Sequence, residues 1–297
     1  MPVITPTNPA NRDGRFAPSP TGELHLGNLR TALLAWLSAR ADGARFLMRI
    51  EDLDPDRSVA GLAEQQLADL RVIGIDWDGP EVVQSKQRPA HDAAVAQLVA
   101  RGVVYRCWCT RAEVLEAASA PHENLPGGAY VGTCRELTPA DHCAARAAGK
   151  TSCLRVRAAA VELAFNDEVM GEVSAIVDDF VIVRKDGVPA YNLAVVVDDA
   201  AAGVGHVVRG DDLALGTPRQ LLLQSWLGLP HPSYAHVPLM LDSDGQRLSK
   251  RSGSVTVAQR RALGDDDAQI RALVIELAGL GERAERISND ELLARYR

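Results

Sequence analysis

Residues 15–28 read Arg15-Phe16-Ala17-Pro18-Ser19-Pro20-Thr21-Gly22-Glu23-Leu24-His25-Leu26-Gly27-Asn28, and they set the organisation of the chain. We predict that residues 15–17 form a short strand that breaks at the two prolines. Leucines then recur at helical spacing, which predicts an amphipathic helix, at Leu26, Leu29, Leu33, Leu34 and Leu37. A helix that begins after such a loop points free N–H groups and its positive dipole end at the loop. The loop is therefore a candidate anion site.

Outward from this stretch, strand-like and helical segments alternate. The predicted order is strand Arg45–Ile50, helices Ser58–Ile73 and Arg88–Arg101, and strand Val103–Arg106. The alternation resumes with Phe180–Val183, Ala190–Val197, Gly203–Arg209 and helix Thr217–Leu227. From His231 onward we expect loops and then two weak helices, Asp265–Leu280 and Asn289–Tyr296. This rhythm favours an α/β fold, a parallel sheet with helices on its faces.

The predicted domain order follows from where the rhythm breaks. We expect a flexible tail, the first half of a Rossmann-like catalytic domain, a Cys-rich insertion, the second half of that domain, and a basic loop with a short helical region. Their predicted ranges are 1–14, 15–106, 107–172, 173–240 and 241–297.

Composition excludes several classes of protein. The 297 residues are 46% hydrophobic and 24% charged, as in ordinary folded domains, and carry a net charge of −7. No apolar run is long enough for a membrane span, and the N-terminus lacks a signal-peptide pattern, so we expect a cytoplasmic protein. The negative charge disfavours indiscriminate nucleic-acid binding but permits a partner that meets one basic face.

Two short motifs suggest binding of a phosphate-containing ligand. Gly27 lets the backbone approach a ligand closely, and His25 can donate a hydrogen bond to a phosphate; the alternative is a Pro-rich turn with a surface histidine. Residues 246–253 place several cations on a loop rich in Gly and Ser. Such a loop can close over a triphosphate, with Lys250 stabilising the leaving pyrophosphate. The alternative for this loop is a solvated charge run.

Taken together, the motifs resemble one family. Residues 15–25 resemble the opening signature of glutamyl-tRNA synthetases, which are class I aminoacyl-tRNA synthetases. His25-Leu26-Gly27-Asn28 resembles the class I "HIGH" element with Asn28 in place of the last His, and residues 247–251 resemble the "KMSKS" loop. Three further similar stretches lie between them in the family's order, at residues 49–54, 190–199 and 208–212.

This resemblance implies activation of L-glutamate by ATP, accompanied by Mg²⁺, to glutamyl-adenylate. Its implied catalytic residues are His25, Gly27 and Lys250, and its ATP-binding residues are His25, Gly27, Asn28 and Lys250. Arginine pairs with a carboxylate through a planar fork, which suits a glutamate side chain. The residues implied for glutamate binding are Arg15, Ser19, Glu51, Tyr191 and Arg209.

Five cysteines bunch in one third of the chain, at Cys107, Cys109, Cys134, Cys143 and Cys153. An odd number argues against a disulfide framework. A distinctive subgroup of glutamyl-tRNA synthetase relatives carries Cys-x-Cys followed by Tyr-x₃-Cys as a site for one Zn²⁺. The resemblance to this pattern lies in Cys107, Cys109, Tyr130 and Cys134. His122, His142 and Cys143 compete with Tyr130 for the fourth position, and free buried cysteines are the alternative to a metal site.

About 44 residues follow Gly253, too few for the anticodon-reading region of a full glutamyl-tRNA synthetase. With the zinc pattern, this resembles the glutamyl-queuosine tRNA(Asp) synthetases. That subgroup activates glutamate without tRNA and transfers it to the queuosine base at the wobble position of tRNA(Asp). We therefore expect ATP, L-glutamate and tRNA(Asp) as partners of a monomer. The alternatives are a truncated synthetase that charges the tRNA 3′ end, and a non-catalytic paralogue that binds amino acid or tRNA.

Overall fold

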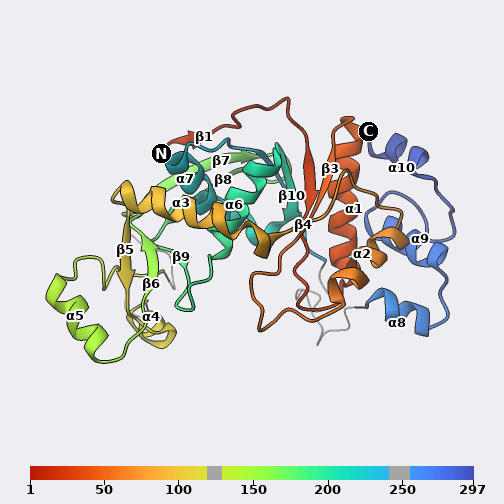
Figure 1. Cartoon of the computed structure of the whole chain (residues 1–297). Coiled ribbons are helices and arrows are strands. Elements are labelled where there is room, and N and C mark those ends of the chain that lie inside the picture. Colours follow the sequence, from red (N-terminus) through yellow and green to blue (C-terminus); the bar gives the residue numbers. More distant parts are fainter. Residues whose placement is uncertain (119–128, 241–254) are drawn as a thin grey trace.

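Parallel strands form the centre of the computed structural model, which describes residues 1–118, 129–240 and 255–297 (Figure 1). One parallel set has the order β2-β3-β4, and the other has the order β1-β7-β11-β10 with β8 antiparallel to β7. The two sets adjoin, because the carbonyl oxygen of Asp13 accepts hydrogen bonds from the N–H groups of Gly205 and His206. The strands are β1 Val3–Ile4, β2 Gly14–Phe16, β3 Phe46–Ile50, β4 Val82–Val83, β7 Val161–Asp167, β8 Gly171–Val177, β10 His206–Gly210 and β11 Ser233–Val237.

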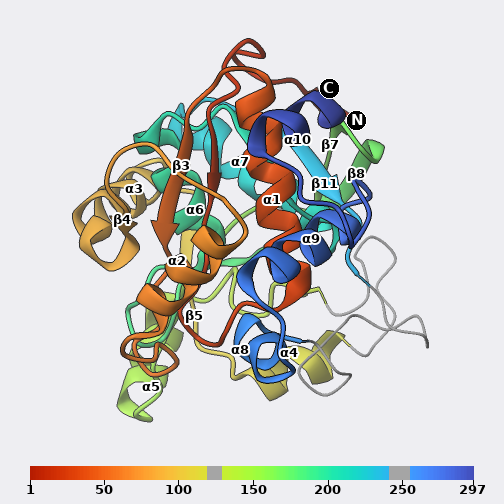
Figure 2. The same cartoon turned by 90° about the vertical axis from the view of Figure 1, so that its right-hand side faces the viewer.

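Helices cover both faces of these strands. On one face α1 packs with α9 and α10, and Figure 2 shows both helices lying along α1. On the other face α3, α6 and α7 share a second apolar core (Figure 1). The helices are α1 Leu26–Ala41, α2 Leu62–Val72, α3 Arg88–Ala100, α6 Tyr191–Ala202, α7 Thr217–Leu227, α8 Val257–Ala262, α9 Asp267–Leu277 and α10 Asn289–Tyr296. In the described ranges, no helix combines the length and apolar character needed to cross a bilayer.

A separate antiparallel sheet, β5-β6-β9, lies beside this core and carries the cysteines. Its strands are β5 Val104–Cys107, β6 Cys153–Val156 and β9 Val181–Val183, and its helices are α4 Arg111–Ala118 and α5 Pro139–Ala147. We call this sheet with its two helices the Cys-rich unit. Figure 1 places it at one end of the molecule, far from α9 and α10.

The structure differs from the predicted organisation at its boundaries. Residues 1–14 are not a free tail, because β1 pairs with β7 and Arg12 forms an ion pair with Glu168. The boundary predicted at residue 172 falls inside the β7–β8 hairpin. β7 belongs to the main sheet, so the predicted insertion contains a strand of the core.

Two elements also differ in kind from the sequence prediction. Residues 190–197 were expected to extend the strand pattern, but Tyr191 begins helix α6, whose buried residues include Leu193 and Val196. An unbroken apolar run fits a buried helix as well as a buried strand, so periodicity does not separate them. Strand β11 lies where loops were expected after His231, and it pairs with both β10 and β7.

Candidate active site

The loop between β2 and α1 is shaped by a capping box at the start of α1. The Nδ1 atom of His25 accepts a hydrogen bond from the N–H of Asn28 at 3.2 Å, and the Asn28 side chain accepts from the N–H of His25 at 3.2 Å. This satisfies two backbone donors that a helix start leaves without partners. Because Nδ1 is an acceptor, a neutral His25 carries its proton on Nε2.

Gly27 makes room for the His25 ring. A Cβ atom built on Gly27 would lie 3.1 Å from both Cε1 and Nδ1 of that ring, which is tighter than ordinary contact. A side chain at this position would therefore require the ring to move by a few tenths of an ångström. The glycine of the "HIGH"-like element thus has a local reason that does not depend on any ligand.

Two buried arginines and two carboxylates meet under the loop. Arg49 lies 2.5 Å from Asp199 and 2.9 Å from Glu51, and the Nε atom of Arg15 lies 3.4 Å from Asp199. Burial raises the pKa of Asp199, but Arg49 and Arg15 outweigh burial and hold that pKa below its usual value. For Glu51 burial wins, and its pKa is raised although Arg49 opposes the shift.

Arg209 is held from β10 by neutral partners. Its guanidinium donates to His236 at 3.0 Å, to the hydroxyl of Thr217 at 2.8 Å and to the hydroxyl of Tyr191 at 3.4 Å. His236 in turn contacts Asp167 at 2.6 Å. Within the described ranges each terminal nitrogen of Arg209 makes one of these bonds, and its second N–H can donate to a ligand.

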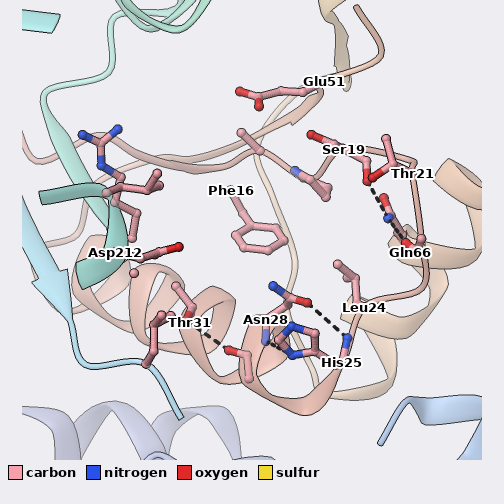
Figure 3. Close-up of a pocket in the computed structure, with 18 of the residues that line it drawn as sticks. Phe16, Ser19, Thr21, Leu24, His25, Asn28, Thr31, Glu51, Gln66 and Asp212 are labelled. Carbon is pink, nitrogen blue, oxygen red and sulfur yellow. Dashed lines mark hydrogen bonds between the residues drawn. The ribbon is translucent and has the colours of Figure 1, made fainter. Parts of the chain in front are cut away.

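Arg15, Glu51 and Arg209 line one cavity of about 680 Å³. Figure 3 shows Glu51 and Ser19 on one side of it and His25 with Asn28 on another. The residues predicted for catalysis and for ATP and glutamate binding line this cavity wherever the structure describes them: Arg15, Ser19, His25, Gly27, Asn28, Glu51, Tyr191 and Arg209. A pocket of this size with a few converging polar groups suits a small-molecule ligand.

Lys250, the remaining predicted residue of this site, lies outside the described residues, as does the rest of the "KMSKS"-like stretch. The described residues on either side of it adjoin the cavity. Leu239 and Met240 line the cavity, while Thr256 forms a bridge with His25 and the carbonyl oxygen of Val255 accepts from Leu26.

Three cysteines form a second cluster, in the Cys-rich unit. The Sγ atoms of Cys107, Cys109 and Cys134 all lie within 4.8 Å of one another. The Tyr130 hydroxyl lies 3.4 Å from the Cys107 sulfur and 3.9 Å from the Cys109 sulfur, and it accepts from the N–H of Cys134 at 2.7 Å. Three sulfur atoms this close together could hold a metal ion, and thiolates are typical ligands of tetrahedral Zn²⁺ sites.

The competing ligands are placed differently. His142 accepts a hydrogen bond from the Trp108 indole at 2.9 Å through Nδ1, and Cys143 is exposed on α5. His122 lies outside the described residues. The cluster is also tied to the core, because Asp178 accepts from the N–H of Tyr130 and pairs with Arg219 of α7 at 2.6 Å.

Comparison with known proteins gives the family. The model for "tRNA synthetases class I (E and Q), catalytic domain" matches residues 13–294. The chain belongs to this family. The match covers both clusters described above, so the cavity and the cysteines lie within a class I synthetase catalytic domain.

Curated relatives of this class I chain are identical to it at roughly half of the aligned positions. A glutamyl-Q tRNA(Asp) synthetase of Nocardia farcinica is 55% identical over 283 residues, covering 95% of this chain and 88% of the relative. One from Symbiobacterium thermophilum is 49% identical over 292 residues, covering 94% of this chain and 90% of the relative.

Solved class I structures agree in fold. A glutamate tRNA ligase from Elizabethkingia meningosepticum, in complex with its amino acid, superposes with a TM-score of 0.78 at 29% identity. The glutamate-tRNA synthetase from Elizabethkingia anophelis gives 0.79 at 29% identity. Both matches cover 95% of this chain, which spans 64% and 65% of those longer proteins.

Sequence reasoning missed several groups of this synthetase site. Gln66 lines the cavity from α2 and donates to the carbonyl oxygens of Ser19 and Gly22 at 3.0 and 2.7 Å. Thr217 and His236 hold Arg209, and neither lies in one of the sequence motifs that resemble the family. The Leu62–Val72 helix could have pointed to Gln66, because Gln66 falls on its buried face.

Proposed function

We propose that this chain activates L-glutamate with ATP, without tRNA, and transfers it to the queuosine base at the wobble position of tRNA(Asp). The observation that carries the first half is the cavity lined by two buried arginines, Arg15 and Arg209, beside the loop at His25. The names of the curated relatives support the second half.

In the first step an oxygen of the glutamate α-carboxylate attacks the α-phosphorus of ATP. An O–P bond forms, which gives glutamyl-adenylate, and the bond from the α-phosphorus to the bridging oxygen breaks as pyrophosphate leaves. Arg209 and Arg15 hold the side-chain carboxylate, which has to be paired because burying it alone is costly. Glu51 holds the α-ammonium group, and Tyr191 and Ser19 supply further polar contacts.

At the other end of the cavity, the start of α1 receives phosphate oxygens. Nε2–H of His25 and the N–H of Gly27 are the donors there, whereas the N–H of Asn28 is used by the His25 cap. Lys250 stabilises charge on the leaving pyrophosphate. ATP arrives with Mg²⁺, which neutralises part of the phosphate charge. In the second step a hydroxyl of the queuosine cyclopentene-diol attacks the acyl carbon, and AMP leaves.

Two assays test this proposal in order. Glutamate-dependent exchange of pyrophosphate into ATP, run without tRNA, is expected to be positive; its absence from zinc-replete protein would favour a non-catalytic binding role. Labelled glutamate is then offered with tRNA(Asp) that carries queuosine, the same tRNA with guanosine at the wobble position, and tRNA(Glu). Label on the first alone supports the proposal, and label at a 3′-terminal adenosine contradicts it.

We also propose that Cys107, Cys109, Tyr130 and Cys134 bind one Zn²⁺. Cys109→Ser is expected to lower bound zinc and the melting temperature together, since metal binding is coupled to folding. Cys143→Ser is the matched control, because Cys143 is exposed and outside the cluster. Unaltered zinc content of Cys109→Ser by atomic absorption would remove that residue from the site.

A further inference from the structure

A fully buried pair, Asp167 and His236, lies directly behind Arg209. Both side chains have an exposed fraction of 0%, and the Oδ2 atom of Asp167 lies 2.6 Å from Nδ1 of His236. The Oδ1 atom accepts from the backbone N–H groups of Val169 and Met170 at 3.0 and 2.9 Å. The carboxylate is therefore fixed in place from β7, and only one of its oxygens faces the imidazole.

These contacts assign the protons of His236. A carboxylate oxygen is an acceptor, so Nδ1 carries the proton and donates it to Asp167. The Nε of Arg209 always carries a proton and points at Nε2 of His236 from 3.0 Å, so Nε2 has to present its lone pair. His236 is thus neutral. Asp167 fixes the orientation of its ring, and the ring in turn fixes the position of the Arg209 Nε.

We propose that Asp167 and His236 are positioning residues that fix the Arg209 guanidinium for the carboxylate of the substrate. The inference rests on the proposed function, because it takes that carboxylate to be the glutamate side chain. Arg209 is held at Nε by His236 and at its ends by Thr217 and Tyr191, so its remaining N–H groups have a set direction. A guanidinium that is already held in its binding orientation loses less conformational freedom when the ligand binds.

The surroundings keep His236 neutral near neutral pH. The charged groups that act on it are Asp167, Arg209 and, farther away, Arg15, while the Tyr234 ring stacks on it at 5.9 Å. Burial and the two arginines lower the pKa of His236, against the opposing effect of Asp167. In acid a proton on Nε2 would displace the Arg209 bond, so the glutamate KM is expected to rise as pH falls below the usual histidine range.

Asp167→Asn tests the chain of contacts from Asp167 through His236 to Arg209, because asparagine has almost the same shape as aspartate. The amide oxygen can keep the backbone donors of Val169, Met170 and His236, which places the NH₂ group against Nδ1 of the His236 ring. That NH₂ group donates to Nδ1 and forces the ring proton onto Nε2, where it opposes the Arg209 N–H. We expect the glutamate KM to rise about tenfold or more, with kcat and the ATP KM within about twofold of the parent.

Two readouts accompany that variant. ¹⁵N-histidine NMR, with the His236 signals assigned by their loss in His236→Gln, is expected to place the proton on Nδ1 in the parent and on Nε2 in Asp167→Asn. Asp92→Asn, an exposed carboxylate on α3, is the matched control and should leave all values unchanged. An unchanged glutamate KM in Asp167→Asn, or equal losses in kcat and the ATP KM, would overturn the proposal.

A second pair keeps the test decisive if Asp167→Asn does not fold. The side chain of His236→Gln retains an oxygen that can accept from Arg209, whereas His236→Leu retains none. A smaller rise of the glutamate KM in the Gln variant supports positioning, and equal rises contradict it. If the parent shows no pyrophosphate exchange, the proposed function fails separately, and a parent proton on Nε2 would independently overturn the chain of contacts from Asp167 to Arg209.

Discussion

The two buried arginines of the cavity are held in opposite ways. Arg15 contacts Asp199 at 3.4 Å, and Arg49 contacts the same carboxylate at 2.5 Å. Arg209 instead contacts one imidazole and two hydroxyls. Within the described part of the chain, Arg209 forms no ion pair. The carboxylate of Asp167 lies behind it and is connected to it through His236.

The difference indicates which arginine is stabilised more by the negative charge of a ligand. The charge of Arg15 already has a counter-charge in the protein, although two arginines share it. The side chains that hold Arg209 are neutral, so a ligand carboxylate supplies a direct counter-charge that these partners do not. We therefore expect Arg209 to contribute more to glutamate affinity than Arg15, and four changes test this comparison.

The largest effect is expected from Asp199→Asn, which removes the anion that Arg15 and Arg49 share and leaves Arg49 with Glu51. Two buried cations then lose their shared anion, and the free energy of unfolding should fall by about 3 kcal/mol. Because the pKa of Asp199 in the folded protein lies below its usual value, its contribution is complete above pH about 4 and is lost as pH falls further. Urea unfolding at pH 7 and pH 3 measures both effects.

The exposed substitution Asp92→Asn serves as the control for that experiment. If Asp199→Asn were as stable as the parent at pH 7, the carboxylate would not be the counter-charge of these arginines. A stability difference that grew toward pH 3 would have the wrong sign for a lowered pKa.

Arg209→Gln comes next, with an expected rise in the glutamate KM of about 100-fold. Loss of one partner from a buried charged contact costs about 2–5 kcal/mol, and 100-fold corresponds to about 2.7 kcal/mol. Pyrophosphate exchange over a range of glutamate concentrations measures it, with the exposed Arg88→Gln as control. Preference for glutamate over glutamine should fall in parallel, and retained preference would contradict the role of Arg209.

Arg15→Gln is expected to have a smaller effect, about tenfold on the glutamate KM. Its charge is partly compensated by Asp199, and Arg49 remains to pair with that carboxylate after the change. The same exchange assay applies. An effect larger than that of Arg209→Gln would reverse the ranking drawn from the two environments.

Tyr191→Phe is expected to have the smallest effect, about threefold on the glutamate KM. The hydroxyl lies 3.4 Å from Arg209, which is a long hydrogen bond, and Tyr191 is 41% exposed. Water can replace a hydroxyl at such a position. A loss comparable to that of Arg15→Gln would show that Tyr191 contacts the ligand more closely than it contacts Arg209.

Local rules predict the first part of the fold well. The strand, loop and helix around Pro18 form as expected, because the leucines of α1 follow its buried face and His25 caps its start. The described residues predicted for the site also line one cavity, since the loop and the carboxyl ends of parallel strands meet at one edge. Their individual roles remain predictions.

The groups behind the site could not be predicted in the same way. Strand β11 carries Ser233 and His236 among its buried residues and is preceded by Pro230 and Pro232, so no apolar run marks it. Asp167 lies in a segment that the cysteine pattern assigned to an insertion. The pairing of these residues depends on β7 and β11 being neighbours, which is a long-range property of the sheet.

The carboxylate of Asp178 has a consequence for protein engineering. It joins Tyr130 of the cysteine cluster to Arg219 of α7, and α7 begins at Thr217, a partner of Arg209. The Cys-rich unit therefore cannot be removed without affecting the core of the catalytic domain. Deleting the unit would remove the Tyr130 N–H that donates to Asp178 and would disturb the contact between Asp178 and α7. A shortened enzyme should therefore keep this hydrogen bond or supply another donor to Asp178.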